Sequence, residues 1–386
     1  MMDFSNLDAL LQSSLNIAFP AAQLVIYQRG QIIYERNVGY PDPESPAQPI
    51  THNTRFDLAS VSKLFTVATF MRLVEEGRTS LDQPMCEVLP AFTGARPIQP
   101  QPDPLGNGST IAIVPPTNDT ADASRVAFRH LLSHTSGLPA WLPLWKVGLG
   151  LQAEGALNSD IQLRLREMTL QTAFAYPTGA RVVYSDVGLI LIGLAIEQLS
   201  ELSLDAAMRE RITQPLALAS IGYSPIPCDD AAPTEFYAHQ GRRMCGEVHD
   251  ENAFALNGVA GHAGLFGAAR DVAVFGEALR TALAGTTNEP LLQQATLREM
   301  TRLQAQDGDV RRGIGFALWS PNPRAMSHAL SPSAFGHLGF TGTSLWVDPE
   351  RELTFACLTN HIYYGREGED TMTPFRVALA QALKPL

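Results

Sequence analysis

A serine and a lysine three residues apart are the first candidates for chemistry in this sequence. Ser60 and Lys63 lie in the apolar stretch Leu58-Ala-Ser-Val-Ser-Lys-Leu-Phe-Thr-Val-Ala. If a helix starts here, both side chains lie on one face and the amine can reach the hydroxyl. A serine needs an adjacent base to become a strong nucleophile, and free N–H groups in a first helical turn can stabilise an oxyanion. The pair therefore predicts a nucleophilic serine with a lysine as proton acceptor; the alternative is a capping serine and a snorkelling lysine.

Lysine is rare in this chain, which makes Lys63 more informative. Only three of the 28 basic residues are lysines, the other two being Lys146 and Lys384. Arginine keeps its proton in proteins, whereas a partly buried lysine can lose it. A lysine kept in an apolar stretch is thus a hint of proton transfer.

Two further motifs carry polar groups at positions suited to a site. Tyr184-Ser185-Asp186 lies in a loop just before an apolar helix, where Ser185 or Asp186 could also be a simple N-cap. His337-Leu338-Gly339 lies at the edge of a predicted strand among several glycines. Glycine in a strand often marks a place where a ligand or another backbone comes close, although His337 could equally be a surface residue beside a turn.

Together the three motifs resemble those of the serine β-lactamase and penicillin-binding protein superfamily, in which Ser-x-x-Lys, Tyr-x-Asn and Lys/His-x-Gly follow in this order. Their spacing resembles the class C β-lactamase branch with its esterases and D-Ala-D-Ala carboxypeptidases. Residues 131–138 are similar to a family signature. Residues 246–253 and 258–266 are similar to a subgroup related to penicillin-binding protein 4B.

The resemblance implies a role for each matching residue. Ser60 would be acylated, and Lys63 and Tyr184 would share the proton transfers. The backbone N–H groups of Ser60 and Phe340 would form the oxyanion hole. Substrate-binding residues would be Asp186, His337, Gly339 and Phe340, while His134 and His262 would be structural loop residues near the cleft.

Two positions depart from the family pattern. Asp186 stands where Asn is more usual, and a carboxylate only accepts hydrogen bonds. It would hold Lys63 as an ammonium, favour Tyr184 as the working base and repel an anionic substrate. His337 stands where β-lactamases usually have Lys; it would be mostly neutral at pH 7, partly charged near pH 6, and a weaker attractor of carboxylates.

Both departures favour a serine hydrolase that acts on an amide or ester through an acyl-enzyme. It would be carboxypeptidase-, amidase- or esterase-like and at most a weak β-lactamase. The alternative is a catalytically silent penicillin-binding-like protein, although Ser60, Lys63 and Tyr184 are all present. We expect a small-molecule or peptide substrate, and a peptide derived from the cell wall is one candidate.

Strand-like segments occur near both ends of the chain. Residues 23–28 and 31–36 flank Arg29-Gly30 and predict a β-hairpin, and three further strands are predicted between residues 313 and 359. The predicted fold is α/β (α+β) and β-lactamase/transpeptidase-like, with one antiparallel sheet built from both termini. The sheet region comprises residues 1–58 and 301–386. A mostly helical region, 59–300, carries a Pro/Gly-rich excursion at 93–127, and the whole forms one compact catalytic unit.

Composition excludes several other classes of protein. The net charge of -11 and a pI near 5.3 argue against nucleic acid as a partner. The longest apolar run, residues 187–196, is too short for a membrane segment. The N-terminus lacks a secretory signal, so we expect a cytoplasmic protein, or a periplasmic one if a leader was trimmed.

No cofactor or metal is expected. A metal site could be imagined from His249, Asp250, Glu251 and His262, or from His130 and His134, but the His-Glu-x-x-His pattern is missing. Gly-x-Ser-x-Gly is also missing, which disfavours an α/β-hydrolase. The four cysteines (Cys86, Cys228, Cys245 and Cys357) are interpreted as reduced thiols, with Cys228 and Cys245 able to pair in an exported protein.

Overall fold

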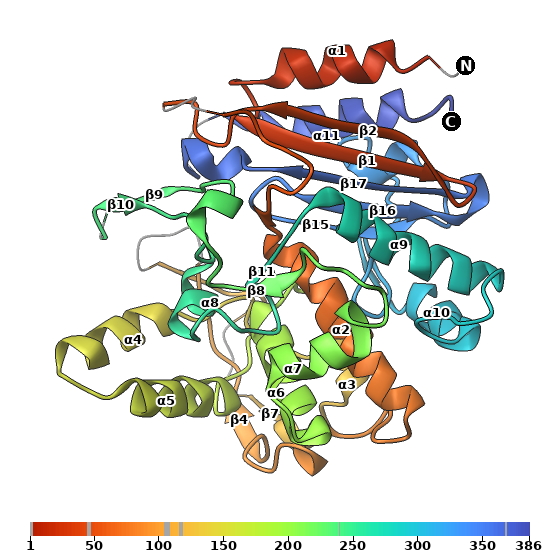
Figure 1. The fold of residues 1–386 in the computed structure, drawn as a ribbon. Helices are drawn as coiled ribbons and strands as arrows, with labels where there is room; N and C mark the ends of the chain where they lie inside the picture. Colours follow the sequence, from red (N-terminus) through yellow and green to blue (C-terminus); the bar gives the residue numbers. More distant parts are fainter. Residues whose placement is uncertain (1–2, 45–47, 104–108, 116–118, 239, 367–368) are drawn as a thin grey trace.

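The fold combines a large sheet with a mostly helical region, in a computed structural model that describes residues 3–44, 48–103, 109–115, 119–238, 240–366 and 369–386 (Figure 1). The sheet is antiparallel and eight-stranded, in the order β12-β13-β14-β15-β16-β17-β1-β2. Its strands are β12 Ala305–Asp307, β13 Val310–Arg312, β14 Ala317–Leu318, β15 Phe335–Leu338, β16 Ser344–Asp348, β17 Leu353–Thr359, β1 Ala21–Gln28 and β2 Gln31–Gly39.

The two ends of the chain meet in this sheet, as the sequence predicts. β1 pairs with β17 in antiparallel register from Ala22↔Thr359 to Gln28↔Leu353. Arg29 and Gly30 join β1 to β2 with φ of 51° and 81°. Both positive angles suit the tight turn that matches the twist of a hairpin. The predicted hairpin and the single antiparallel sheet are therefore confirmed.

Helices cover both faces of the sheet (Figure 1). The apolar residues of β1 alternate accordingly: Val25 packs in the cluster that includes α9, Ala269–Ala284, and Leu24 packs in the cluster that includes α1, Ser5–Ser14, and α11, Met372–Ala382. A strand with apolar side chains on both faces needs such a cover on each side. The helix α9 comes from the 59–300 segment of the sequence, yet it packs on β1, β16 and β17.

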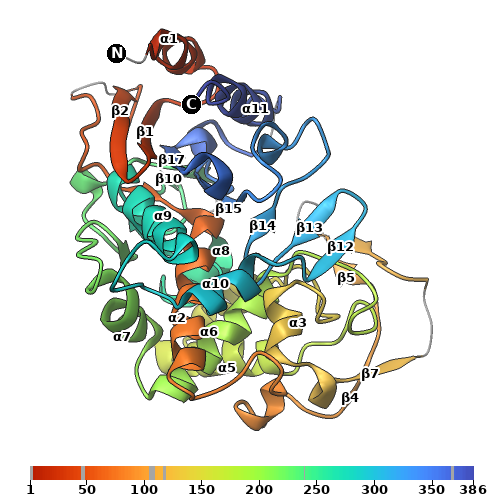
Figure 2. The same ribbon diagram turned by 90° about the vertical axis from the view of Figure 1, so that its right-hand side faces the viewer.

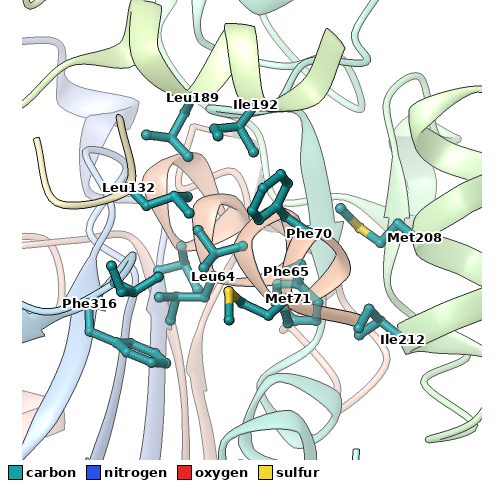
Figure 3. Packing of buried hydrophobic residues seen from close by; sticks show 14 of the residues in the cluster. Leu64, Phe65, Phe70, Met71, Leu132, Leu189, Ile192, Met208, Ile212 and Phe316 are labelled. Carbon is teal, nitrogen blue, oxygen red and sulfur yellow. The ribbon is translucent and has the colours of Figure 1, made fainter. Parts of the chain in front are cut away.

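The helical region is built around two buried helices, α2 (Ser62–Glu75) and α6 (Asp186–Ser200). Figure 3 shows Leu64 and Phe70 of α2 packing toward Leu189 and Ile192 of α6. The surrounding helices are α3 Phe128–Leu132, α4 Leu144–Ala153, α5 Asn158–Leu170, α7 Leu204–Met208, α8 Glu251–Ala255 and α10 Gln294–Thr301. Among the described helices, none is by itself long and apolar enough to cross a membrane, although the bent pair Asp186–Ser200 and Leu204–Thr213 passes that test when taken together.

Short strands complete the structure. A three-stranded sheet, in the order β3-β11-β8, lies next to the start of α2 and comprises β3 Phe56–Asp57, β11 Leu265–Gly267 and β8 Gly222–Tyr223. The predicted excursion at 93–127 contains two small strand pairs, β4 Ala95–Pro97 with β7 Thr120–Asp122 and β5 Gln101–Pro102 with β6 Thr110–Ile111. A last pair joins β9 Phe236–Tyr237 to β10 Arg242–Arg243.

Two of the four cysteines form a disulfide. Cys228 and Cys245 are bonded, whereas Cys86 and Cys357 are free thiols. The backbone brings the pair together, because the Ile226 N–H donates to the Gly246 carbonyl at 2.8 Å. The interpretation of four reduced thiols is thus wrong for Cys228 and Cys245 and holds for Cys86 and Cys357.

Candidate active site

Ser60 lies in a single 3₁₀ turn, Ala59–Val61, that leads from β3 into α2. Ala59 has a φ of 46°, an unusual left-handed conformation for a residue with a side chain. The buried Asp57 carboxylate accepts a hydrogen bond from the Ala59 N–H at 2.8 Å and stabilises this bend. The Leu58 N–H is held at the same time by the Leu265 carbonyl. The chain therefore turns sharply just before Ser60 and holds it at the head of the helix.

Lys63 is buried and surrounded by three oxygen atoms. Its Nζ lies 2.8 Å from Ser60 Oγ, 2.8 Å from the His262 carbonyl oxygen and 2.8 Å from Asp186 Oδ1. Three acceptors match the three N–H bonds of an ammonium. Burial by itself lowers the pKa of Lys63, but Asp186 and Tyr184 more than offset it and raise the pKa above its usual value. The expected contact between Asp186 and Lys63 is confirmed.

Tyr184 closes the site on the other side of the lysine. Its ring centroid lies 5.0 Å from Lys63 Nζ, 4.7 Å from the His134 ring and 5.8 Å from the His337 ring. Burial raises the pKa of the Tyr184 phenol, and Lys63 lowers it in part. His134 holds the segment in place, because its Nδ1 accepts a hydrogen bond from the Ser185 N–H at 3.1 Å.

The turn between β15 and β16 is tied directly to the segment that precedes Ser60. Thr341 Oγ1 donates to the Asp57 carbonyl at 2.7 Å and Thr343 Oγ1 donates to the Leu58 carbonyl at 2.9 Å. This junction places Phe340 beside Ser60, and both residues line the same cavities. Within the described part of the chain, neither of their backbone N–H groups has an acceptor. Both N–H groups are therefore available to a ligand.

Gly339 is required where this turn meets the segment before Ser60. A Cβ added at Gly339 would lie 2.0 Å from Thr343 Oγ1 and 2.7 Å from the Leu58 carbonyl oxygen. Neither the Leu58 backbone nor the hydrogen-bonded Thr343 hydroxyl could move away without separating the turn from the segment before Ser60. The structure thus gives Gly339 a positioning role in addition to the predicted place in the substrate-binding wall.

His337 is a buried, neutral imidazole. Its Nδ1 lies 2.8 Å from the Leu338 carbonyl oxygen. Because a carbonyl only accepts, Nδ1 carries the proton, and Nε2 is left as an unprotonated acceptor. Burial, reinforced by the charges of Lys63 and Arg312, lowers the pKa of His337 to about 3. The expectation that His337 becomes partly charged near pH 6 is therefore wrong.

Two arginines of the site were missed by sequence reasoning. Arg376 of α11 donates from Nη2 to the Gly339 carbonyl at 2.6 Å and to the Thr343 carbonyl at 3.1 Å. Arg312 of β13 lies over the Tyr184 ring, with Cζ 5.4 Å from the ring centroid. Neither arginine lies in a recognisable motif. Because most basic residues of this chain are arginines, the presence of an arginine does not by itself indicate a functional site.

Ser60 opens into two cavities that meet at Ser60, Tyr184 and Phe340. The strand-side cavity, of about 590 Å³, is lined by strands β13–β16 and α11, including Arg311, Arg312, His337, Trp346 and Arg376. The helix-side cavity, of about 750 Å³, is lined by residues that include Trp141, Trp145, His249, Asp250 and Glu251. Both are of a size that holds a small organic ligand.

Both histidines that line the helix-side cavity are paired with a carboxylate. His262 Nε2 lies 2.8 Å from Asp250 Oδ1, and His249 Nε2 lies 2.8 Å from Glu235 Oε2. Across the described residues, no group of three His, Cys, Asp or Glu side chains gathers in a way that could hold a metal ion.

The arrangement around Ser60 defines a class of enzyme, a serine hydrolase that works through an acyl-enzyme. The fold agrees with this class, and the comparison with known proteins gives the family. The chain belongs to the beta-lactamase family, whose model matches residues 7–378.

Individual relatives span most of the chain. The N-acetylmuramyl-L-alanine amidase of Bacillus subtilis (strain 168) is 30% identical over 382 residues, which cover 92% of this chain and 80% of the relative. Among solved structures, EstCE1, a hydrolase with promiscuous acyltransferase activity, has a TM-score of 0.69 at 23% identity and covers 98% of both chains. A penicillin-binding protein homolog from Caulobacter crescentus has a TM-score of 0.69 at 20% identity, over 98% of this chain and 96% of that one. At such identities the two structures support the fold alone.

Proposed function

We propose that Ser60 Oγ is the nucleophile that attacks the carbonyl carbon of an amide or ester and becomes acylated. The observation that carries this proposal is the 2.8 Å contact between Ser60 Oγ and the buried Nζ of Lys63. A nucleophile within hydrogen-bond reach of a buried basic group is the arrangement that covalent catalysis requires. The free N–H groups of Ser60 and Phe340 would stabilise the oxyanion that forms on the carbonyl oxygen.

Lys63 and Tyr184 would handle the proton as a pair. As an ammonium held by three oxygens, Lys63 cannot accept the Ser60 proton, and a neutral Tyr184 phenol cannot either. The reactive form is therefore the one in which the pair has lost one proton, either from Lys63 Nζ or from the Tyr184 hydroxyl. On attack the Ser60 proton enters the pair and passes to the leaving group as the scissile bond breaks. Water then follows the reverse route and releases the acid from Ser60.

The substrates we propose are small amides or esters, including peptides derived from the cell wall. The name of the Bacillus relative, an N-acetylmuramyl-L-alanine amidase, supports a cell-wall peptide. The two cavities on either side of Ser60 support a substrate that extends on both sides of the scissile bond.

Labelling with a fluorophosphonate tests the assignment of Ser60. The wild-type chain should gain the mass of one adduct, and Ser60→Ala should gain none and should lose at least about a thousandfold in turnover of 4-nitrophenyl acetate. Ser62→Ala is the matched control, since Ser62 is buried two residues further along, at the first position of α2, and its hydroxyl accepts from the Leu265 N–H. An adduct that persists in Ser60→Ala would overturn the assignment, and a wild-type chain without adduct or turnover would favour the silent binding protein.

A further inference from the structure

Segment 246–253 lines the helix-side cavity with three side chains, although none of the residues assigned to the proposed reaction belongs to it. These side chains are His249, Asp250 and Glu251. Asp250 and Glu251 each contact another polar side chain of the same cavity. In the described part of the chain, His249 is the one of the three that also contacts both sides of the proposed oxyanion site, the segment before the nucleophile and the ring of Phe340.

The backbone of His249 is tied to the turn that presents Ser60. Its N–H donates to Asp57 Oδ2 at 2.6 Å, while Asp57 Oδ1 accepts from the Ala59 N–H at 2.8 Å. One buried carboxylate therefore joins His249 to the residue that precedes the nucleophile. The His249 carbonyl accepts in turn from the Tyr237 hydroxyl. Both backbone polar groups of His249 are thus fixed.

The imidazole of His249 is fixed by a charged partner. The residue is 4% exposed, and its Nε2 lies 2.8 Å from Glu235 Oε2. Although burial raises the pKa of Glu235, hydrogen bonds from His249 and Arg366 lower it to about 2. The carboxylate is therefore ionised at neutral pH and only accepts, so Nε2 of His249 carries the proton and donates. Arg366 Nη2 binds the same oxygen of Glu235 at 2.7 Å and holds this acceptor in place.

The ring held in this way packs on the side chain of Phe340. The two rings are stacked, with centroids 5.8 Å apart and planes 25° from parallel. Stacked rings attract one another at centroid separations of about 4.5–7 Å. Phe340 is 52% exposed where the two cavities meet, and among the described residues His249 is its ring partner. Loss of the imidazole would free the Phe340 side chain to change rotamer. Because the ring and the N–H group are attached to the same Cα, such a movement would also displace the N–H.

From these contacts we infer that His249 is a positioning residue, which holds the Phe340 N–H in place relative to the turn of Ser60 so that both N–H groups bind the oxyanion together. The inference rests on the proposed function, because it concerns the oxyanion formed during attack by Ser60. Preorganised donors stabilise a transition state because they need not move as charge develops. Segment 246–253 thereby has a part in the reaction without touching the reacting atoms.

Loss of the imidazole should impair turnover without removing the nucleophile. His249→Ala keeps the backbone N–H that binds Asp57 and should lower kcat for phenyl acetate by about ten- to hundredfold, less than the full loss of an oxyanion donor. His249→Leu fills more of the space but has no ring to stack, so it should give a similar fall, and it serves where the cavity left by alanine prevents folding. His130→Ala is the matched control, because this half-buried histidine accepts from the Ala127 N–H and lines neither cavity. Its kcat should stay within about threefold of the wild-type value.

A thionoester shows whether the loss lies in the oxyanion contacts. O-Phenyl thionoacetate carries a C=S group in place of the C=O group of phenyl acetate, and sulfur is a weak hydrogen-bond acceptor. The measurement is the ratio of kcat/KM for the ester to that for the thionoester, each divided by its rate of uncatalysed hydrolysis. This ratio should fall about fivefold or more in both His249 variants and stay within about twofold of wild type in His130→Ala. A variant that is merely unfolded in part loses both activities alike and keeps the ratio.

A double-mutant cycle tests whether His249 acts through the Phe340 ring. Phe340→Ala removes that ring and keeps the backbone N–H. In this background His249→Ala should lower kcat by less than about threefold, since the contact that it removes is already gone. End-point fluorophosphonate labelling of Ser60 in each variant separates these results from failure of the proposed function, which a wild-type chain without adduct would indicate. An ester-to-thionoester ratio that does not change in the His249 variants, or an undiminished effect of His249→Ala beside Phe340→Ala, would overturn the inference.

Discussion

The state of Lys63 controls what the site can do at a given pH. Its Nζ has three oxygens at 2.8 Å, and one of these oxygens belongs to the Asp186 carboxylate. Asp186 raises the pKa of Lys63 and also that of Tyr184. The proton that the pair must lose before Ser60 can attack is therefore held more tightly because Asp186 stands where an asparagine is more usual.

Replacement of Asp186 by Asn should release this proton at lower pH. The reactive form appears as pH rises through the apparent pKa of the Lys63–Tyr184 pair, so the acidic limb of kcat/KM reports that pKa. Loss of a carboxylate in contact with the lysine should move the limb downward by about one pH unit or more. The measurement is kcat/KM for a neutral ester between pH 4.5 and 9.

An exposed acid at the same site provides the control. Asp309 lines the strand-side cavity and is exposed, so Asp309→Asn removes the same charge without contact with Lys63 and should leave the limb in place. A limb that does not move in Asp186→Asn would mean that the carboxylate serves the first turn of α6 and has no part in proton transfer.

At this scale, the sequence predicted those site residues that lie close to one another along the chain. Ser60 and Lys63 are one helical turn apart, and Tyr184 and Asp186 flank a helix start, so their types and spacing could be read directly. Arg312 and Arg376 come from a strand and a helix far along the chain and reach the site through the tertiary fold alone. The protonation of His337 was missed for the same reason, because its burial beside Lys63 is a property of the assembled site.

Between elements, the contact of α11 with the β15–β16 turn sets the geometry of the oxyanion site. Arg376 donates to the Gly339 and Thr343 carbonyls, which flank the turn that carries Phe340. Burial lowers the pKa of Arg376 to about 10, so it remains charged at neutral pH. A buried cation that binds two carbonyls restrains both ends of the turn. We regard Arg376 as a positioning residue for the Phe340 N–H.

Arg376→Met should lower kcat for esters by about ten- to hundredfold with a smaller change in KM. Loss of an oxyanion donor lowers kcat by about a hundred- to a thousandfold, and displacement of the donor should lower kcat by less than its loss. Arg376→Lys should recover part of kcat, since one amine can still reach a carbonyl. The melting temperature of each variant is measured in parallel. A fall in melting temperature with kcat intact would show that the contact is structural only.

The elements themselves differ in how far they could be predicted. The β1–β2 hairpin carries its own signal in Arg29-Gly30 and the flanking β-rich runs, and it forms as expected. The turn of Ala59–Val61 before α2 was not foreseen, because its left-handed Ala59 depends on Asp57 and on the Leu265 carbonyl from a distant strand. The place of α9 on the sheet was also missed, since an apolar helix face does not show which surface it will cover.

At the scale of the whole molecule, the nucleophile and the proposed oxyanion turn belong to different parts of the chain. Ser60 heads a helix of the helical region, whereas Phe340 follows a strand of the sheet. The junction is closed by the two threonine hydroxyls that bind the Asp57 and Leu58 carbonyls. The site therefore exists only when the sheet is complete, and the sheet needs both ends of the chain.

The fold should require the N-terminal hairpin next to β17, but it should not require that the hairpin come first in the sequence. All seven residues of β17 are buried between β16 and β1, so a chain that lacks residues 1–39 would expose an apolar edge strand and should aggregate.

The termini lie close together in both views (Figures 1 and 2), and Leu7 and Leu11 of α1 pack in one cluster with Phe375 and Leu379 of α11. A circular permutant that joins Leu386 to Asp3 through a flexible linker of about ten Gly and Ser residues, with new ends between the exposed Asn288 and Glu289, should fold. It should label at Ser60 and keep kcat/KM within about threefold, because connections cut at exposed loops are tolerated. Size-exclusion chromatography and fluorophosphonate labelling compare the permutant with the truncated chain. An unfolded permutant would mean that the hairpin must be attached directly ahead of Ser60 for the sheet to assemble, and a soluble, labelled truncation would mean that the site does not depend on β1.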